Sequence, residues 1–266
     1  MNLTELINYL NFTYNQSKIQ TRIFDFETIG EIEYLEPKYF YRGESDSYPY
    51  TRTTLVRLLQ EGKLKPSELT EYIFVHYNLY LFLRESLFGI SCVEEADHGK
   101  PNIELFISGI LQHYGFDTSF LDVTSDLKIA ANFASMNNVG TKGRILVIES
   151  NSLNHDNSNY YFGLIKCPGL RPQRQSSYVI FDQFRNLDLK DNNFLSAHGG
   201  NWFDFKLTKE DKERFCDSSI LSIENDEVAQ QLNEWWNYAD SAKQINSSSI
   251  KYLLIEKFKT LNKIVL

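Results

Sequence analysis

The sequence predicts an α+β fold in which helices pack against a mixed sheet. Short apolar stretches bounded by Gly, Pro and Asn are typical of strands, and longer stretches with apolar residues at helical spacing are typical of helices. Both kinds of segment occur along the 266 residues, without an internal repeat or a low-complexity tract. Nineteen Phe and sixteen Tyr indicate a core built largely from aromatic side chains.

The first elements are a helix and a group of strands. Residues 3–14 predict a short amphipathic helix, for which Thr4 is a candidate cap. Residues 22–41 have a β-like pattern that Gly30 and Pro37 interrupt. The apolar side chains of both segments are therefore expected to contribute to the core.

The clearest helix begins at Pro66-Ser67 and runs to about Leu87, with Ser67 as its cap. Its apolar residues predict the face that the helix buries. We expect that face to comprise Ile73, Phe74, Tyr77, Leu81 and Leu83 or their neighbours.

The rest of the chain continues the same alternation of helices and strands. The expected elements are a loop near 97–101, helices at 103–114 and about 126–137, a strand at 144–149, an exposed loop at 150–159, strands at 160–165 and 178–181, a helix containing Trp235 and Trp236, and a last apolar run at 251–266. We expect one domain over residues 1–266, with a motif core at about 20–185 and a C-terminal extension or subdomain at 186–266.

Composition excludes several classes of protein. A net charge of −8 and a pI near 5.2 argue against broad binding to nucleic acid or to anionic membranes, because both require a basic surface. No segment approaches the roughly 20 apolar residues of a membrane-spanning helix. Neither the three cysteines nor the five histidines have the spacing of a metal site, so we expect no metal. A reducing, cytoplasmic setting is the expectation.

Two segments concentrate polar side chains beside core-type residues. One is Phe40-Tyr41-Arg42-Gly43, in which the glycine permits a close backbone approach and the arginine offers a planar set of donors for carboxylate or phosphate. The other, residues 112–124, combines a His, two Asp, two Thr and a Ser, and it leads into a stretch with apolar residues at helical spacing. Such a segment is either a structural hydrogen-bond network or part of a site.

Together these segments resemble the FRG domain, a family named for its aromatic-Arg-Gly motif. The resemblance runs, in order, through Tyr41-Arg42-Gly43, Thr54-Leu55-Val56-Arg57, Gln112-His113-Tyr114-Gly115, Thr118, Leu121-Asp122, Thr124, Ala130 and Phe133-Ala134. The chain has Asp117, Phe120 and Val123 where the family usually has Pro, Leu and Trp, and these differences alter packing more than chemistry.

Each candidate side chain has a structural alternative. Arg42 either pairs with a buried carboxylate, such as Asp122 or Glu44, or holds a phosphate or carboxylate of a ligand. For His113, a structural or substrate-positioning role is favoured over acid–base catalysis. For Asp122, capping the next helix or pairing with an arginine is favoured over a role as base or nucleophile.

The order of the segments is also similar to the layout of the Arg-Ser-Glu class of ADP-ribosyltransferases. That resemblance implies an ADP-ribosyltransferase-like core and NAD as a substrate, with Arg42 gripping a phosphate or ribose. Thr124 and Ser125 would line the nicotinamide pocket, and Gln175 would take the place of the Glu. A neutral Gln stabilises the developing oxocarbenium charge poorly, so the chain either binds a nucleotide without turning it over or uses another carboxylate, such as Asp122 or Glu149.

Two hypotheses follow, a nucleotide-directed protein and a non-catalytic interaction module. The candidate catalytic residues are Gln175, Asp122 and His113, and the candidate ligand-binding residues are Arg42, Gly43, Arg57, Gln112, Thr118, Thr124, Ser125 and Arg171. In the module, these residues form a buried polar network, and exposed aromatic side chains recognise a protein partner. A site would instead require Arg42, His113 and Gln175 to converge on an open pocket.

Overall fold

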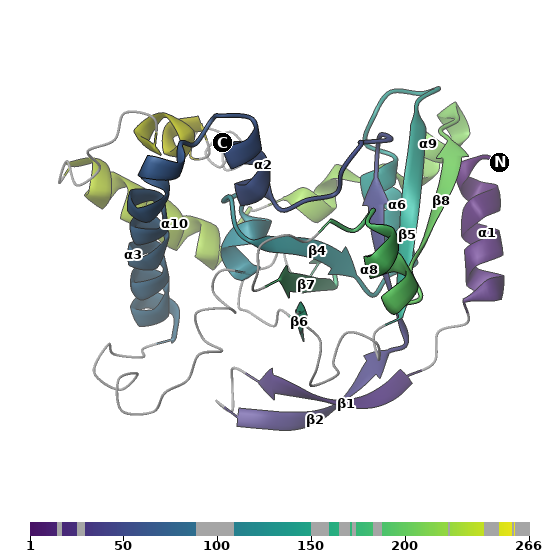
Figure 1. The fold of residues 1–266 in the computed structure, drawn as a ribbon, viewed down its shortest axis with the longest axis horizontal. Helices are drawn as coiled ribbons and strands as arrows, with labels where there is room; N and C mark the ends of the chain where they lie inside the picture. The colour runs from purple at the N-terminus through teal and green to yellow at the C-terminus, as the bar shows by residue number, and fades with distance from the viewer. Residues whose placement is uncertain are drawn as a thin grey trace. The chain divides into compact units, whose positions relative to one another are not determined.

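A computed structural model describes residues 1–14, 18–25, 30–88, 109–149, 160–164, 171, 174–182, 188–222, 224–241, 250–256 and 258 (Figure 1). The chain divides into two compact units, and each unit is assembled from three separate stretches of sequence. Unit 1 comprises Met1–Thr53, Leu121–Leu164 and Arg174–Ile220, and unit 2 comprises Thr54–Phe120, Ile165–Gln173 and Leu221–Leu266. The domain boundaries expected from the sequence stay a prediction.

A six-stranded sheet forms the centre of unit 1, in the order β6-β7-β4-β3-β5-β8. Its strands are β3 (Tyr39–Glu44), β4 (Phe120–Thr124), β5 (Lys142–Glu149), β6 (Tyr160–Leu164), β7 (Ser177–Asp182) and β8 (Asn201–Lys206). The pairs β3–β4, β3–β5, β5–β8 and β6–β7 are antiparallel. A separate two-stranded antiparallel sheet joins β1 (Lys18–Asp25) to β2 (Gly30–Pro37). The predicted α+β class is therefore confirmed.

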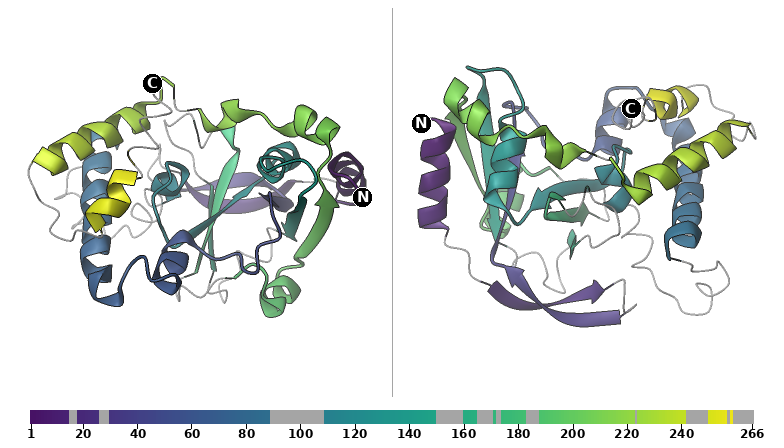
Figure 2. Two further views of the ribbon diagram at one scale, coloured as in Figure 1. Left: turned by 90° about the horizontal axis from the view of Figure 1, so that it is seen from above. Right: turned by 180° about the vertical axis from the view of Figure 1, so that it is seen from behind.

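The strand β5 is interior to the sheet, as its sequence predicted, and its residues 145–148 are all buried. Four consecutive apolar residues suit a strand that is covered on both faces. Ile145 and Val147 belong to a core cluster that includes residues of α1 (Leu3–Thr13) and α6 (Leu127–Ala134). Their neighbours Leu146 and Ile148 belong to a second cluster, which includes Phe194 of α8 (Asn192–Ala197). Figure 2 shows α1 and α6 next to each other.

The first helix is capped by a residue that the sequence pattern did not single out. The Asn2 side chain accepts a hydrogen bond from the Glu5 amide at 2.8 Å, and the Glu5 carboxylate accepts one from the Asn2 amide at 2.9 Å. This reciprocal pair is a capping box. The prediction that Thr4 caps the helix was therefore wrong, because Thr4 lies inside the first turn and binds Asp211 instead.

Unit 2 is built from helices. They include α2 (Thr54–Gln60), the 3-10 turn η1 (Pro66–Glu68), α3 (Leu69–Phe88) and α10 (Glu227–Ser241). The helices α3 and α10 pack against each other. Phe258, which is buried, stacks on Trp236 of α10 with ring centroids 4.6 Å apart.

The buried face of α3 differs from the expected one. Leu83 is buried as predicted, but Ile73, Phe74 and Tyr77 are 41%, 62% and 43% exposed. The apolar residues that the helix does bury are Tyr72, Val75, Leu79, Tyr80 and Leu83, and Arg84 is buried as well. Because α3 carries apolar side chains around most of its circumference, periodicity defines two alternative faces. Its cap was also misassigned, since Lys65 and not Ser67 precedes the first turn.

Several predicted segments lie partly or wholly outside the described residues. The expected loops at 97–101 and 150–159 are among them, and of the helix expected at 103–114 the structure describes residues 109–113, which are helical. Residues 250–256 of the last apolar run are also helical. The remaining elements are α9 (Lys209–Phe215) and the 3-10 turn η3 (Ser218–Leu221).

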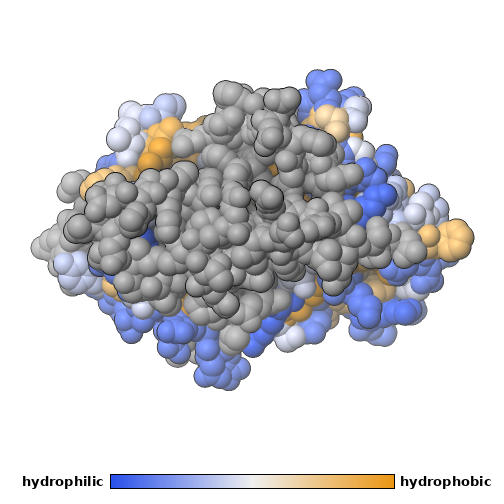
Figure 3. Space-filling view, turned by 90° about the horizontal axis from the view of Figure 1, so that it is seen from below, coloured by the Kyte–Doolittle hydropathy of each residue, from blue (hydrophilic) through white to orange (hydrophobic). Residues whose placement is uncertain are grey.

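On the face that Figure 3 shows, hydrophilic side chains prevail among the coloured atoms, and hydrophobic ones are interspersed between them. Within the described residues, no helix has both the length and the apolar character that crossing a bilayer requires.

Candidate functional site

The arginine of the aromatic-Arg-Gly motif lies on β3 and binds protein groups. Its Nη1 donates to the main-chain carbonyl of Asp122 on β4 at 2.6 Å, and its Nε lies 3.7 Å from Oε1 of Glu44. One quarter of the Arg42 side chain remains exposed. The arginine therefore joins two strands, and its side chain stays partly open to solvent.

Glu44 is the carboxylate at the centre of this polar group. It is buried, and its Oε1 accepts a hydrogen bond from the Thr51 hydroxyl at 2.6 Å. Its Oε2 lies 3.2 Å from Nζ of Lys190. A buried carboxylate is tolerated when cations and donors surround it, and here two cations share one acid. The alternative that Arg42 pairs with Glu44 is thus realised, whereas with Asp122 the described contact is to the main-chain oxygen.

Gly43 permits the backbones of β3 and α6 to approach each other closely. A Cβ atom at this position would lie 1.8 Å from the main-chain oxygen of Ala130 and 2.9 Å from the nitrogen of Ala134. Both alanines belong to the helix and are buried. The glycine of the motif is therefore required for packing, and the close approach that its sequence predicted is to a helix of the same unit.

The end of the motif block binds the segment around Gln175. The Thr124 hydroxyl donates to the main-chain oxygen of Gln175 at 2.8 Å, and the Ser125 amide donates to that of Ser176 at 3.3 Å. Gln175 is 4% exposed, and its Nε2 donates to the main-chain oxygen of Ile220 at 3.3 Å. The residue expected in the place of the catalytic Glu is thus buried, and its amide group binds the backbone.

The cap of α6 is Asp126, whose carboxylate accepts a hydrogen bond from the Lys128 amide at 2.7 Å. The Thr124 hydroxyl accepts from the Asp126 amide at 3.1 Å and so holds the cap in place. The expectation that Asp122 caps this helix was wrong, because Asp122 lies within β4, four residues before the true cap.

In unit 2, the first half of the motif block binds α2. The Thr118 amide donates to the Thr54 hydroxyl at 3.1 Å, and the Leu55 amide donates to the Thr118 carbonyl at 3.3 Å. The Thr118 hydroxyl also donates to the side-chain oxygen of Gln112. His113 is buried at 4% exposure, whereas Arg57 points to solvent from α2. Gln112 and Thr118 thus form a polar pair within the unit.

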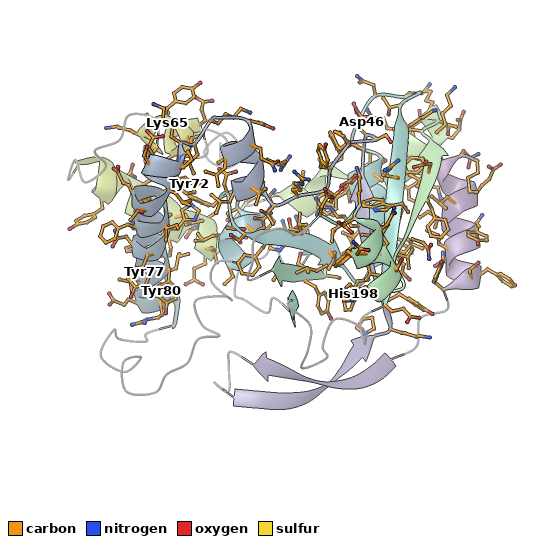
Figure 4. The ribbon with its side chains drawn as sticks, viewed as in Figure 1. Asp46, Lys65, Tyr72, Tyr77, Tyr80 and His198 are labelled. Atoms are coloured by element: carbon orange, nitrogen blue, oxygen red, sulfur yellow. The ribbon has the colours of Figure 1, made fainter. Side chains whose placement is uncertain are left out.

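Two further acids of unit 2 hold buried tyrosines. The Tyr72 hydroxyl donates to Asp117 at 3.1 Å. Burial raises the pKa of Tyr72 well above its usual value, and the charge of Asp117 raises it further. Figure 4 shows Tyr72 with Tyr77 and Tyr80 along α3. Asp117, which occupies the position of the family's usual Pro, thus accepts a hydrogen bond from the buried Tyr72.

Asp226 was missed in the sequence, although an Asp directly before a helical pattern is a capping signal. Its carboxylate accepts from the Tyr114 hydroxyl at 2.7 and 2.8 Å, from the Val228 amide at 3.0 Å and from the Arg171 amide at 3.1 Å. It therefore caps α10 and also fixes the backbone at Arg171. This contact of Arg171 with Asp226 is made by the main-chain amide of Arg171 and does not involve its side chain.

The candidate residues are distributed over both units. Unit 1 contains Arg42, Gly43, Asp122, Thr124, Ser125 and Gln175, and unit 2 contains Arg57, Gln112, His113, Thr118 and Arg171. Convergence of Arg42, His113 and Gln175 on one pocket stays a prediction. Among the residues that the structure describes, no group of three or more His, Cys, Asp or Glu side chains could hold a metal ion.

Comparison with known families identifies the motif-bearing part of the chain. The FRG domain family model matches residues 37–142. The chain therefore contains an FRG domain, as the resemblance predicted. The matched stretch includes Arg42, Gly43 and the block at 112–124, and it ends before Arg171 and Gln175. No curated protein and no solved structure matches the chain.

Proposed function

We propose that this chain is a non-catalytic binding module in which the FRG motif residues stabilise the fold. One observation carries the proposal. Gln175, which the resemblance to ADP-ribosyltransferases implies in the place of their glutamate, is buried, and its amide donates to the Ile220 carbonyl. A catalytic group must reach the reacting atoms of a substrate, and a side chain in this position does not face solvent.

The other motif contacts support the same conclusion. Arg42 binds the Asp122 carbonyl and Glu44, and Thr124 binds the Gln175 carbonyl. Buried polar networks of this kind fix a unique fold when their members are paired, and losing one partner typically costs about 1–3 kcal/mol. Internal pairing thus accounts for these residue types without a bound substrate.

The test is release of nicotinamide from NAD by the purified full chain. We expect no release above the rate in buffer, either from the natural protein or from Gln175→Glu. Release that disappears in a folded Arg42→Lys variant would contradict the proposal and would establish an NAD-consuming enzyme. Lys206→Arg is the control, because Lys206 is an exposed cation of unit 1 outside the candidate residues.

A nucleotide-directed site is the second candidate, and one observation favours it. The Arg42 side chain is one-quarter exposed, and it shares Glu44 with a second cation, Lys190. An arginine and a lysine held on one buried acid could take the phosphate of a nucleotide such as NAD. In that case the core is ADP-ribosyltransferase-like, and Asp122 of the same unit supplies the group that Gln175 cannot. The nicotinamide assay separates the two candidates.

A further inference from the structure

Unit 1 contains a pocket that none of the FRG motif candidates lines. It lies among α1, α6, α9 and the residues that follow α9, and its volume is about 410 Å³. That volume falls within the range of about 300–1,000 Å³ that is typical of small-molecule sites. The pocket is therefore large enough for an organic ligand.

Asn132 on α6, which lines this pocket, carries an unpaired acceptor. The residue is 3% exposed, and its Nδ2 donates to the main-chain oxygen of Asp217 at 2.8 Å. Its Oδ1 has no hydrogen-bond partner among the described residues and almost no surface open to the pocket. Because a buried acceptor without a donor is unfavourable, an N–H or O–H group of a ligand would favour a shift of this side chain that turns Oδ1 toward the pocket.

The charged side chains at the pocket favour an anion. Lys128 of α6 and Arg214 of α9 both line it and are exposed, and the Arg214 guanidinium lies 5.4 Å from the centroid of the Phe215 ring. Asp217 is the acid in the lining, and its Oδ1 accepts a hydrogen bond from the Ser219 amide at 2.9 Å. Two cations against one acid leave the lining net positive.

The rest of the lining is apolar except for Thr4 and two amide groups. Ile7, Ile129, Phe215 and Ile220 provide apolar surface, and Asn8 and Asn11 of α1 provide donors and acceptors. Sites of this composition hold the body of a ligand by apolar contact and fix its orientation by a few polar groups. A ring system with polar substituents matches that pattern.

We propose that this pocket binds a small organic anion with a flat apolar body and an N–H or O–H donor. The donor would bind Oδ1 of Asn132, and the anionic group would lie between Lys128 and Arg214. This inference rests on the proposed function and deepens it, because it gives the binding module a site and a ligand class. Two sources share the chemistry, namely nucleoside monophosphates and aromatic carboxylic acids.

The experiment is titration calorimetry on the full chain with two sets of probes. One set is AMP, GMP, CMP and UMP, and the other is indole-3-acetate and 4-hydroxybenzoate. We expect saturable binding in one set, which identifies the source, and weaker binding of the matching uncharged compounds, such as adenosine for AMP. Failure of every probe to bind at millimolar concentration would overturn the proposal.

Variants test where the ligand binds. Lys128→Glu and Arg214→Glu change exposed side chains, and we expect each to weaken binding about tenfold, since each replaces an attractive charge by a repulsive one. Asn132→Ala should weaken it by a similar factor, because it removes the acceptor. Lys209→Glu is the matched control, since Lys209 is an exposed cation of the same helix outside the lining. Binding that Lys128→Glu and Arg214→Glu leave unchanged would also overturn the proposal.

The two proposals fail in different ways. NAD turnover that depends on Arg42 would overturn the non-catalytic module and would leave a measured ligand affinity at the pocket intact. An absence of probe binding would overturn the pocket assignment and would leave the nicotinamide result as it stands. Charge reversal at Lys128 remains informative if Asn132→Ala does not fold, because Lys128 is exposed at the helix surface.

Discussion

The Arg42 guanidinium donates to the main-chain carbonyl of Asp122 at 2.6 Å. The two residues lie on neighbouring antiparallel strands, next to the pair formed by Tyr41 and Thr124. A side chain here adds a hydrogen bond between β3 and β4, and its charge also compensates Glu44. The arginine of the motif is thus a structural residue in this chain, whatever else it binds.

Replacing this arginine should destabilise the fold. We expect Arg42→Ala to lower the free energy of unfolding by about 2 kcal/mol, because the Asp122 carbonyl loses a donor and buried Glu44 loses one of its two cations. Urea denaturation measures the change. Arg57→Ala, at an exposed arginine of the same motif set, should stay within about 0.5 kcal/mol of the natural protein. Equal effects of the two substitutions would contradict the structural role of Arg42.

Adding one methyl group at Gly43 should be more damaging. We expect Gly43→Ala to cost about 3 kcal/mol or more, because its Cβ would meet the backbone of α6, which cannot move aside as a side chain can. Thermal unfolding followed by circular dichroism measures the loss. Gly200→Ala is the control, since its Cβ would meet Cδ2 of Leu195 at 2.8 Å, the end of a flexible, partly buried side chain. The prediction fails if Gly200→Ala is the less stable variant.

The carboxylate of Asp211 should make stability depend on pH. It accepts hydrogen bonds from the amides of Leu3, Thr4 and Thr208 and from both threonine hydroxyls, and so joins α1 to α9. Burial acts to raise the pKa of Asp211, but the hydrogen bonds from Thr4 and Thr208 outweigh it and lower the pKa.

A lowered pKa means that the ionised carboxylate stabilises the folded state. This contribution is present above the pKa of the unfolded chain, about 4, and is lost as the pH falls through the lower pKa of the folded state. We expect Asp211→Asn to cost about 2 kcal/mol at neutral pH and progressively less below about pH 4. Urea denaturation over a pH series measures this, and a cost that does not change with pH would contradict it. Glu210→Gln, at an exposed acid of the same turn, is the control.

Restoring a glutamate at position 175 should destabilise the protein. Gln175→Glu places a carboxylate in a buried position and replaces the amide that donates to the Ile220 carbonyl. We expect a loss of about 2 kcal/mol at neutral pH, which becomes smaller under acid, since burial favours the protonated form. Differential scanning fluorimetry at two pH values measures it. A variant as stable as the natural protein at neutral pH would show that the Gln175 side chain has access to solvent.

Local sequence patterns predicted much of unit 1. The buried run at 145–148, the strand that carries Arg42 and the helix after the motif block all follow from the apolar pattern of their own residues. The face of α3 did not follow, because its apolar residues surround the helix and its partner α10 lies far along the chain. Tertiary packing chose between two faces that the pattern makes equivalent.

The polar partners were predicted only where they are close in sequence. Glu44 is two residues from Arg42 and was anticipated as its partner. Asp226 binds Tyr114 across 112 positions, and Asp211 binds Leu3 across 208. When the partner of a carboxylate is so far away in the sequence, the local pattern does not distinguish that carboxylate from a surface acid. The unpaired acceptor of Asn132 is equally hidden, because the local sequence of α6 does not show which groups will surround this side chain.

The division of each unit among three stretches has a practical consequence for anyone who works with FRG domains of this kind. No single cut in the chain yields either unit whole. The family-matched segment ends at Lys142, the first residue of β5, so a fragment trimmed to that boundary would lack the strand that pairs with β3 from Tyr39 to Glu44. Such a fragment would carry an open, apolar strand edge and would be prone to aggregate. Bait proteins and expression fragments should therefore include all three stretches of both units, even when only the motif is of interest.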